Sequence, residues 1–289
     1  MTAAAGRLPT FFLVGAQKSG TSTLHRVLQL HPDAFLCDPK EPHYFSDPAQ
    51  AAKGEEWYRS LFAEAGDARA VGEASTTYAM YPHYSGVVDR VVDAVPAARL
   101  IYLVREPLAR MRSAYLHGLA WGSETRPIGQ ALREDPRYLQ TSCYALQLEQ
   151  WLRRVPRERV LLLSLDELQD QPGDVLARTA GFLDIDATWR PGAAVPPANV
   201  SVGKRAPRAW WRYLGAATVR SGRTSWVPDW VVRLNDSDSP AVRREIEADE
   251  LEIPAVVAAE LTRALSEDRR RLARLWGPEP SPEWLHPES

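Results

Sequence analysis

Short apolar runs alternate with longer amphipathic segments along this chain. The runs "TFFLVGA" (10–16), "RLIYLV" (99–104) and "RVLLLSLDEL" (159–168) are typical of buried parallel strands. The spacing of apolar residues predicts helices over 21–32, 85–96, 142–156 and 260–276. Because strands alternate with helices, we predict an α/β fold with a mostly parallel central sheet between two helical layers. Ligands of such folds bind at the carboxyl ends of the strands.

The first strand leads directly into a glycine-rich loop and a helix, "FFLVGAQKSGTSTLHRVL" (11–28). Gly15 and Gly20 have the spacing of the nucleoside-triphosphate loop G-x-x-x-x-G-K-[ST], but Thr21 stands in place of its lysine and Lys18 lies inside the loop. Backbone N–H groups at the start of the helix, together with its dipole, favour an anion there. The alternative is an ordinary strand–turn–helix connection that contains glycines.

A second strand-to-helix step, "YLVREPLARMRSAY" (102–115), carries another candidate anion contact. Arg105 leaves the strand into a loop closed by Pro107, and Ser113 follows eight residues after the arginine, about two helical turns away. A guanidinium and a hydroxyl at this spacing can converge on one phosphate. An arginine at a strand end can equally form a surface ion pair.

Composition and charge narrow the class of protein. The 289 residues are 45% hydrophobic and 25% charged, with a net charge of −2, which is ordinary for a globular enzyme and does not suggest a general nucleic-acid binder. No apolar run approaches the length of a membrane span, and the first ten residues lack the core of a secretory signal. Two cysteines, Cys37 and Cys143, predict small buried residues rather than a disulfide framework, so we expect a cytoplasmic protein.

We find no linker that would divide the chain, so residues 1–289 are expected to form one domain with a loose N-terminus at 1–9. The amino-acid composition changes between about 190 and 230, where basic residues and tryptophans occur without acidic residues up to Pro228. This basic region would cap a bound cofactor or contact substrate. Interleaved basic and aromatic residues also suit a protein that binds an anionic polymer without catalysis.

Five ordered segments resemble the sulfotransferases that use 3′-phosphoadenosine-5′-phosphosulfate (PAPS), in particular a bacterial branch related to heparan sulfate sulfotransferases. "GAQKSGTSTL" (15–24) is similar to their 5′-phosphosulfate loop and "LVREPLARMRSAY" (103–115) to their 3′-phosphate strand and helix. The other three segments are "DPKEPHYFSD" (38–47), "AVGEASTTY" (70–78) and "NVSVGKRAPR" (199–208). The resemblance spans nearly the whole chain, and it implies a fold like that of P-loop proteins.

The resemblance implies PAPS as the cofactor, adenosine 3′,5′-bisphosphate as its product, and no metal. Lys18 would neutralise charge on the departing phosphate. Glu41 stands where the family carries its catalytic glutamate, and His43 would support it or serve as the base itself. The residues that would bind the cofactor are Gly15, Gln17, Lys18, Ser19, Gly20, Thr21, Ser22, Thr23, Arg105, Ser113, Tyr144, Gly203, Lys204 and Arg205. Segment 38–47 can alternatively be a surface turn, segment 199–208 a basic surface loop, and Tyr144 a core residue.

Glu73 resembles the family's strand-end glutamate, and pairing with a neighbouring cation is the alternative. Some heparan-type members have a lysine directly after it and an arginine in the glycine loop; here those positions are Ala74 and Ser22. Both departures argue against a heparan-like acceptor.

The predicted activity is transfer of a sulfuryl group to a hydroxyl, or an amine, of a small molecule or glycan. A P-loop kinase is the first rival hypothesis, and it requires a lysine after Gly20. The non-catalytic binder is the second, and it leaves segment 38–47 without a role.

Overall fold

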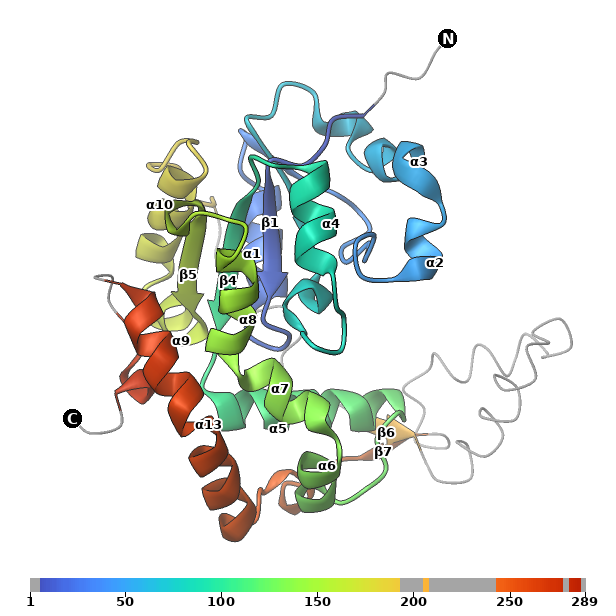
Figure 1. The fold of residues 1–289 in the computed structure, drawn as a ribbon, viewed down its shortest axis with the longest axis vertical. Helices are drawn as coiled ribbons and strands as arrows, with labels where there is room; N and C mark the ends of the chain where they lie inside the picture. The colour runs from blue at the N-terminus through green and yellow to red at the C-terminus, as the bar shows by residue number, and fades with distance from the viewer. Residues whose placement is uncertain (1–5, 193–204, 208–242, 278–280, 287–289) are drawn as a thin grey trace, which may run out of the picture.

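The computed structural model describes residues 6–192, 205–207, 243–277 and 281–286 (Figure 1). A sheet of five parallel strands in the order β2-β3-β1-β4-β5 forms its centre. The strands are β1 (Phe11–Gly15), β2 (Ala34–Leu36), β3 (Ala70–Ala74), β4 (Arg99–Val104) and β5 (Val160–Ser164). The chain adds β2 and β3 on one side of β1 and then crosses to β4 on the other side. Ligands of doubly wound sheets bind at this kind of crossover.

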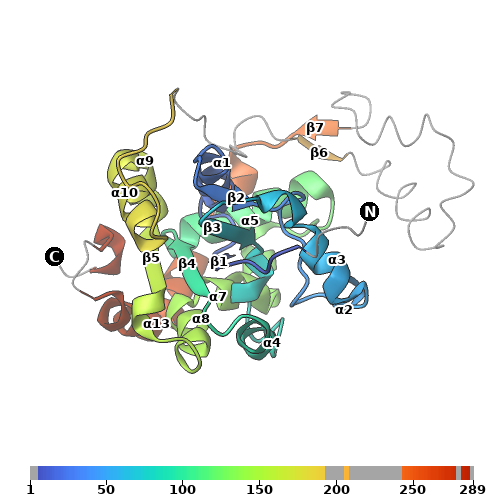
Figure 2. The same ribbon diagram turned by 90° about the horizontal axis from the view of Figure 1, so that it is seen from above.

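Alternate side chains of each strand enter two separate cores. Phe12 and Val14 of β1 pack in a cluster with α4 (Val87–Ala94), α8 (Tyr144–Leu152) and the end of α13 (Ala255–Trp276). Phe11 and Leu13 pack in the other cluster, with α1 (Thr21–Gln29), α9 (Leu165–Asp170) and α10 (Pro172–Phe182). Figure 2 shows these helices on opposite sides of the strands. The predicted three-layer α/β fold is therefore confirmed, because the period of two along each strand gives both faces an apolar surface.

A third cluster of helices lies beyond the carboxyl ends of the strands. It combines α5 (Pro107–Trp121), α6 (Ile128–Glu134), α7 (Pro136–Ser142) and the first half of α13 around a shared apolar core. In Figure 1 the arrowhead of β1 points toward α5. A short antiparallel pair, β6 (Arg205–Pro207) with β7 (Arg243–Glu245), packs against α5 and was not predicted from the sequence.

Two element boundaries differ from the sequence prediction for identifiable reasons. The strand expected over 159–168 ends at Ser164, whose side chain and that of Glu167 form a capping box that begins α9. The helix expected over 142–156 begins at Tyr144, because Cys143 leaves helical geometry between α7 and α8. The spacing of apolar residues does not indicate where such a capping box or break in a helix occurs.

The remaining described elements complete the layers. Helices α2 (Pro48–Ala51) and α3 (Gly54–Ser60) link β2 to β3. Short 3-10 turns occupy Ala63–Ala65, Thr76–Ala79, Arg157–Arg159, Asp249–Leu251 and Glu283–Leu285. Of the N-terminal segment expected to be loose, residues 1–5 lie outside the described ranges, whereas Arg7 donates to the carbonyls of Gly66 and Ala68 at 3.0 Å each.

The structure also bears on the expectations about cysteines and membrane spans. Both cysteines are free, Cys37 being buried and Cys143 only half-buried. Within the described ranges, none of the helices has the length and apolar character that crossing a membrane requires.

Candidate active site

The phosphate loop, residues 15–21, joins β1 to α1 at the centre of the sheet edge. Gly20 precedes the helix with a φ of 93°, and a Cβ there would lie 2.7 Å from Leu165 Cδ1, so the position requires glycine. No side chain caps the helix at Gly20, and its first turn carries no acidic residue. Ser19 is fully buried, and its hydroxyl makes no hydrogen bond of good geometry within the described chain. It lies near the Tyr144 hydroxyl and acts to lower the pKa of that group. The loop is therefore built to accept an anion.

Arg105 lies at the carboxyl end of β4, next to this loop. Its guanidinium Nη1 donates to the Lys18 carbonyl at 3.4 Å, and its own carbonyl accepts from the Tyr144 hydroxyl at 2.8 Å. Burial lowers the pKa of Arg105, and Arg112 acts in the same direction. A half-buried guanidinium without a bonded carboxylate is stabilised by an incoming anion.

Helix α5 brings Ser113 to the region beyond Arg105. Ser113 is buried on this helix, six residues after Pro107. On the same helix, Arg110 is fully buried and donates from Nε to Ser142 Oγ at 2.5 Å and from Nη2 to the Tyr138 carbonyl at 2.7 Å. Arg110 thus donates hydrogen bonds to acceptors in the last turns of α7, which is a structural role.

The Glu41 segment, residues 38–47, lies against the loop that follows β3. The Thr76 hydroxyl donates to Glu41 Oε2 at 3.2 Å, and the Lys40 ammonium pairs with the other carboxylate oxygen. His43 Nε2 lies 3.5 Å from Glu41 Oε2, and its Nδ1 lies 2.9 Å from Thr77 Oγ1. The two candidate proton carriers are therefore neighbours rather than alternatives at separate places.

The surroundings of His43 favour its neutral imidazole. Burial is the largest influence and lowers its pKa, while Glu41 acts in the opposite direction. Since the carboxylate of Glu41 can only accept, the proton belongs on Nε2, and Nδ1 then accepts from the Thr77 hydroxyl. Ser46 Oγ, 2.7 Å from Thr77 Oγ1, continues this chain of hydroxyls.

Three of the four described non-glycine residues with a positive φ belong to this site; the fourth, Asp184, lies in a turn after α10. Lys18, Glu41 and His43 have φ values of 69°, 63° and 55°, the left-handed region that residues with a side chain seldom occupy. Such conformations persist only where surrounding contacts fix them, and they concentrate at functional sites. All three residues proposed from the sequence for chemistry are in this group.

Glu73, at the end of β3, is fully buried, and no ion pair of its carboxylate occurs within the described residues. Ser75 Oγ donates to its Oε1 at 2.6 Å, and the Tyr58 hydroxyl donates to Oε2. Burial raises the pKa of the Glu73 carboxyl, and the surrounding hydroxyls act in the opposite direction. The alternative of pairing with a cation therefore does not hold in the part of the chain that is described.

Two predicted cofactor residues, Gly203 and Lys204, lie outside the described residues, as does most of the basic region at 190–230. Arg205 is described at the start of β6, where its guanidinium lies 3.4 Å from Glu245 Oε1. Its neighbour Ala206 packs among α5 residues in the third core. Strand β6 therefore places Arg205 beside α5, the helix that carries Ser113.

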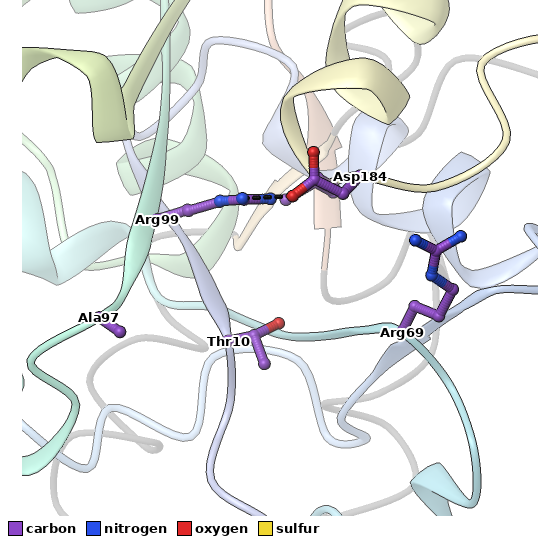
Figure 3. Close-up of a pocket in the computed structure, with 6 residues that line it drawn as sticks. Thr10, Arg69, Ala97, Arg99 and Asp184 are labelled. Carbon is purple, nitrogen blue, oxygen red and sulfur yellow. Dashed lines mark hydrogen bonds and ion pairs between the residues drawn. The ribbon is translucent and has the colours of Figure 1, made fainter.

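A pocket of about 330 Å³ lies at the other edge of the sheet, where β1 and β4 begin (Figure 3). Thr10, Arg69, Arg99 and Asp184 line it, and Arg99 pairs with Asp184. In Figure 3 Arg69 extends from the opposite wall of this pocket. The pocket is thus remote from the candidate chemistry at the carboxyl ends of the strands.

Among the described residues, no three histidine, cysteine, aspartate or glutamate side chains form a group suited to a metal ion. Sequence reasoning also missed several groups that support the site. These are Lys40, Ser75, Thr76 and Thr77 around Glu41 and His43, and Trp284, whose ring lies 6.2 Å from that of Tyr144. The run of hydroxyl residues after Glu73 was the available signal for three of them.

Comparison with known proteins agrees with this arrangement. The family described as "Sulfotransferase domain" matches residues 8–198. Heparan sulfate glucosamine 3-O-sulfotransferase 5 of Mus musculus is 29% identical over 191 residues, which cover 62% of this chain and 54% of that protein. The bifunctional heparan sulfate N-deacetylase/N-sulfotransferase 2 of Bos taurus is 31% identical over 201 residues, covering 62% of this chain and 22% of that protein. The match thus spans about half of the first relative and about a fifth of the second.

A solved structure extends the similarity beyond the matched segment. The crystal structure of a sulfotransferase from Alicyclobacillus acidocaldarius superposes with a TM-score of 0.67 at 26% sequence identity. It covers 96% of this chain and 99% of its own. Because the family match covers well over half of the 289 residues, this chain belongs to the sulfotransferase domain family.

Proposed function

We propose that this chain transfers a sulfuryl group from PAPS to a hydroxyl, or an amine, of a carbohydrate or small-molecule acceptor. Membership of the sulfotransferase domain family supports the reaction class. The names of relatives that act on heparan sulfate glucosamine support a carbohydrate as one acceptor class. Ala74 and Ser22, which stand where some heparan-type enzymes carry cations, favour an acceptor less acidic than heparan sulfate.

One observation carries the proposal. Neighbouring strands β3, β1 and β4 deliver three kinds of group to a single sheet edge: the hydroxyls that hold Glu41, the phosphate loop, and Arg105. A base, an anion-binding loop and a second anion contact are the groups that sulfuryl transfer from a nucleotide needs.

The residues present fit PAPS. The buried Ser19 hydroxyl and the uncapped start of α1 suit a phosphosulfate, which brings its own acceptor oxygens. When bound, this cofactor supplies an activated sulfuryl group and leaves as adenosine 3′,5′-bisphosphate. The residues that would hold its 5′ end are Gly15, Gln17, Lys18, Ser19, Gly20, Thr21, Ser22 and Thr23; Arg105, Ser113, Tyr144 and the loop with Gly203, Lys204 and Arg205 would hold its 3′ end.

Lys18 and the amides of the phosphate loop supply the positive charge at the 5′ end. They stabilise the negative charge that develops there during transfer, so we propose that no metal ion takes part. Arg105 and Ser113 grip the 3′ phosphate, and this remote binding energy holds the reacting end in position.

Glu41 accepts the proton of the attacking hydroxyl as its oxygen bonds to sulfur. The Thr76 contact and the neighbouring His43 orient the carboxylate for this role. His43, whose Nε2 lies 3.5 Å from Glu41 Oε2, keeps the carboxylate in place, and the protonated Glu41 then releases its proton to solvent.

Calorimetric titration with adenosine 3′,5′-bisphosphate in the presence of a metal chelator tests this proposal. We expect binding by the full chain, and a dissociation constant raised roughly 30- to 100-fold in Arg105→Ala, because a charge-assisted phosphate contact is lost. Arg69→Ala is the matched control, since Arg69 lies in the pocket at the opposite edge of the sheet.

Parallel titrations with ATP plus magnesium and with an oligonucleotide test the two rival functions. Tighter binding of either than of the bisphosphate would contradict the proposal, as would unchanged bisphosphate affinity in Arg105→Ala. A screen of hydroxyl and amine acceptors with sulfur-labelled PAPS then identifies the acceptor class.

A further inference from the structure

The backbone of the Glu41 segment is anchored by two side chains from the loop after β3. The amide of His43 donates to Ser75 Oγ at 3.1 Å, and the amide of Phe45 donates to the Tyr78 hydroxyl at 3.1 Å. Ser75 and Tyr78 are both buried. These contacts hold a stretch in which Glu41 and His43 adopt left-handed backbone conformations.

Each of these anchors is a hydroxyl with a single proton, so the direction of that proton decides what the oxygen can accept. Ser75 gives its proton to Glu73 Oε1 at 2.6 Å, which leaves its lone pairs free for the His43 amide. A second donor to Glu73, the Tyr58 hydroxyl, reaches the other oxygen but contacts no amide of the Glu41 segment.

We propose that Glu73 is a positioning residue: its buried carboxyl group orients the Ser75 hydroxyl, which fixes the backbone that presents Glu41 and His43. This inference rests on the proposed function for its catalytic consequence. Glu73 does not meet substrate, because its side chain has no exposed surface. It acts through Ser75, two residues away, on His43, which is 32 residues from Ser75 in sequence.

The arrangement gives a role to a buried carboxyl group that has no cation partner among the described residues. Burial of a carboxyl group without a charge partner is costly, and hydroxyl donors offset only part of that cost. An apolar residue would fill the space at a lower free-energy cost but would let the Ser75 hydroxyl turn toward other acceptors. Left-handed conformations at Glu41 and His43 would then lose the contacts that fix them.

Glu73→Gln is the first test variant. The glutamine amide keeps the shape of the carboxyl group, but its NH₂ is a hydrogen-bond donor. The hydroxyl that faces this NH₂ must turn its own proton away so that its oxygen can accept. We expect kcat to fall about 10- to 30-fold, while KM for PAPS changes less than about twofold, because the hydrogen bonds of Glu73 in the described residues go to Ser75 and Tyr58 and not to the phosphate loop. The amide of His43 should exchange with solvent at least about tenfold faster, with no change in the amides of β1 and β4.

A double-mutant cycle with Ser75→Ala tests the route. If Glu73 acts through this hydroxyl, the effect of Glu73→Gln on kcat should shrink to less than about threefold in the Ser75→Ala background. Tyr58→Phe removes a donor that contacts no amide of the segment, so it should lower kcat less than Glu73→Gln does. Glu124→Gln, another buried carboxyl group, is the control for a general loss of stability, and its kcat should stay near that of the wild type.

The outcomes separate this inference from the proposed function. Amide exchange is read without any turnover, so it decides the inference even if no sulfuryl transfer is found. Unchanged exchange at His43, or a Glu73→Gln effect that persists in full without the Ser75 hydroxyl, would overturn the positioning role. Should Glu73→Gln fail to fold, Tyr58→Phe and Ser75→Ala still decide: the inference requires faster His43 exchange in Ser75→Ala, and equal exchange in both variants contradicts it.

Discussion

The phosphate loop and the Glu41 segment reach the same edge of the sheet by different means. The turns of the phosphate loop are closed by local bonds: the Ser19 amide donates to the Ala16 carbonyl at 3.2 Å, and the Thr23 amide to the Gly20 carbonyl at 3.0 Å. Strand β4 and its end add two backbone contacts, from the Ala16 amide to the Leu103 carbonyl and from Arg105 to the Lys18 carbonyl. The Glu41 segment is instead held by Ser75, Thr76 and Thr77, which are 32 to 35 residues away from the groups they contact.

The difference matches what each region has to do. An anion site needs backbone amides in a fixed turn, which glycines and a helix start provide by themselves. A base needs one side chain at a defined position and in a defined environment, which only neighbouring elements can supply. Substitutions should therefore act through charge in the phosphate loop and through orientation in the Glu41 segment.

Lys18→Gly should have the largest effect. It removes the ammonium, and we expect kcat to fall by roughly a thousandfold. Glycine accepts the φ of 69° at this position without strain, so the free energy of unfolding should change by less than about 1 kcal/mol. Transfer assays with labelled PAPS and urea unfolding measure the two quantities separately.

Lys53→Ala is the control for loss of a lysine, because Lys53 is exposed and lies over the Trp57 ring at 4.2 Å. A Lys18→Gly enzyme that kept its rate to within tenfold would assign the charge stabilisation to the loop amides alone. The phosphate loop would then act through its backbone amides and not through the Lys18 ammonium.

Glu41→Gln should have the next largest effect. The amide cannot take up the acceptor's proton, so kcat should fall by about 10² to 10³ while affinity for adenosine 3′,5′-bisphosphate stays within twofold. Single-turnover kinetics and calorimetry check the two expectations. Glu55→Gln, an exposed carboxylate on α3, serves as the matched change.

Near-normal turnover in Glu41→Gln would transfer the role of base to His43. A large loss of bisphosphate affinity would instead show that the Glu41 segment and the phosphate loop are not energetically separate. Either result would break the distinction between a charge-based and an orientation-based region.

The smallest effect concerns His25, which links the two regions. It lies on α1, which follows the phosphate loop, and the backbone of Cys37, next to the Glu41 segment, acts to raise its pKa. Burial, and secondly Lys40, lowers the pKa of His25 from 6.5 to about 4, against the opposing influence of Asp38 and Glu41. The unfolded chain therefore takes up a proton between pH 6.5 and 4 that the folded chain does not.

His25 thus contributes fully to stability above pH 6.5, and this contribution is lost as the pH falls to about 4. We expect the wild type to lose roughly 3 kcal/mol more than His25→Gln over this range, measured by urea unfolding at several pH values. His83→Gln, a change at an exposed histidine, should follow the wild type. Parallel curves for the wild type and His25→Gln would contradict the buried neutral state of His25.

The phosphate loop was predicted from sequence because its conformation depends on neighbouring residues. Gly15, Gly20 and the apolar run before them are local signals for a strand, a turn and a helix start. The same holds for Arg105 and Ser113, whose spacing on a strand end and the following helix is local. The strand–helix alternation similarly predicted the parallel sheet.

The sequence determined the candidates Glu41 and His43 but not their relation to each other. Only the parallel pairing of β2 with β3 brings the Glu41 segment beside Ser75, Thr76 and Thr77. The role of Glu73 was equally undecided, because a buried glutamate paired with a cation and one held by hydroxyls look the same in sequence. Local conformation is set by short-range sterics and hydrogen bonds, whereas these contacts depend on which distant hydroxyls the folded sheet places around each carboxyl group.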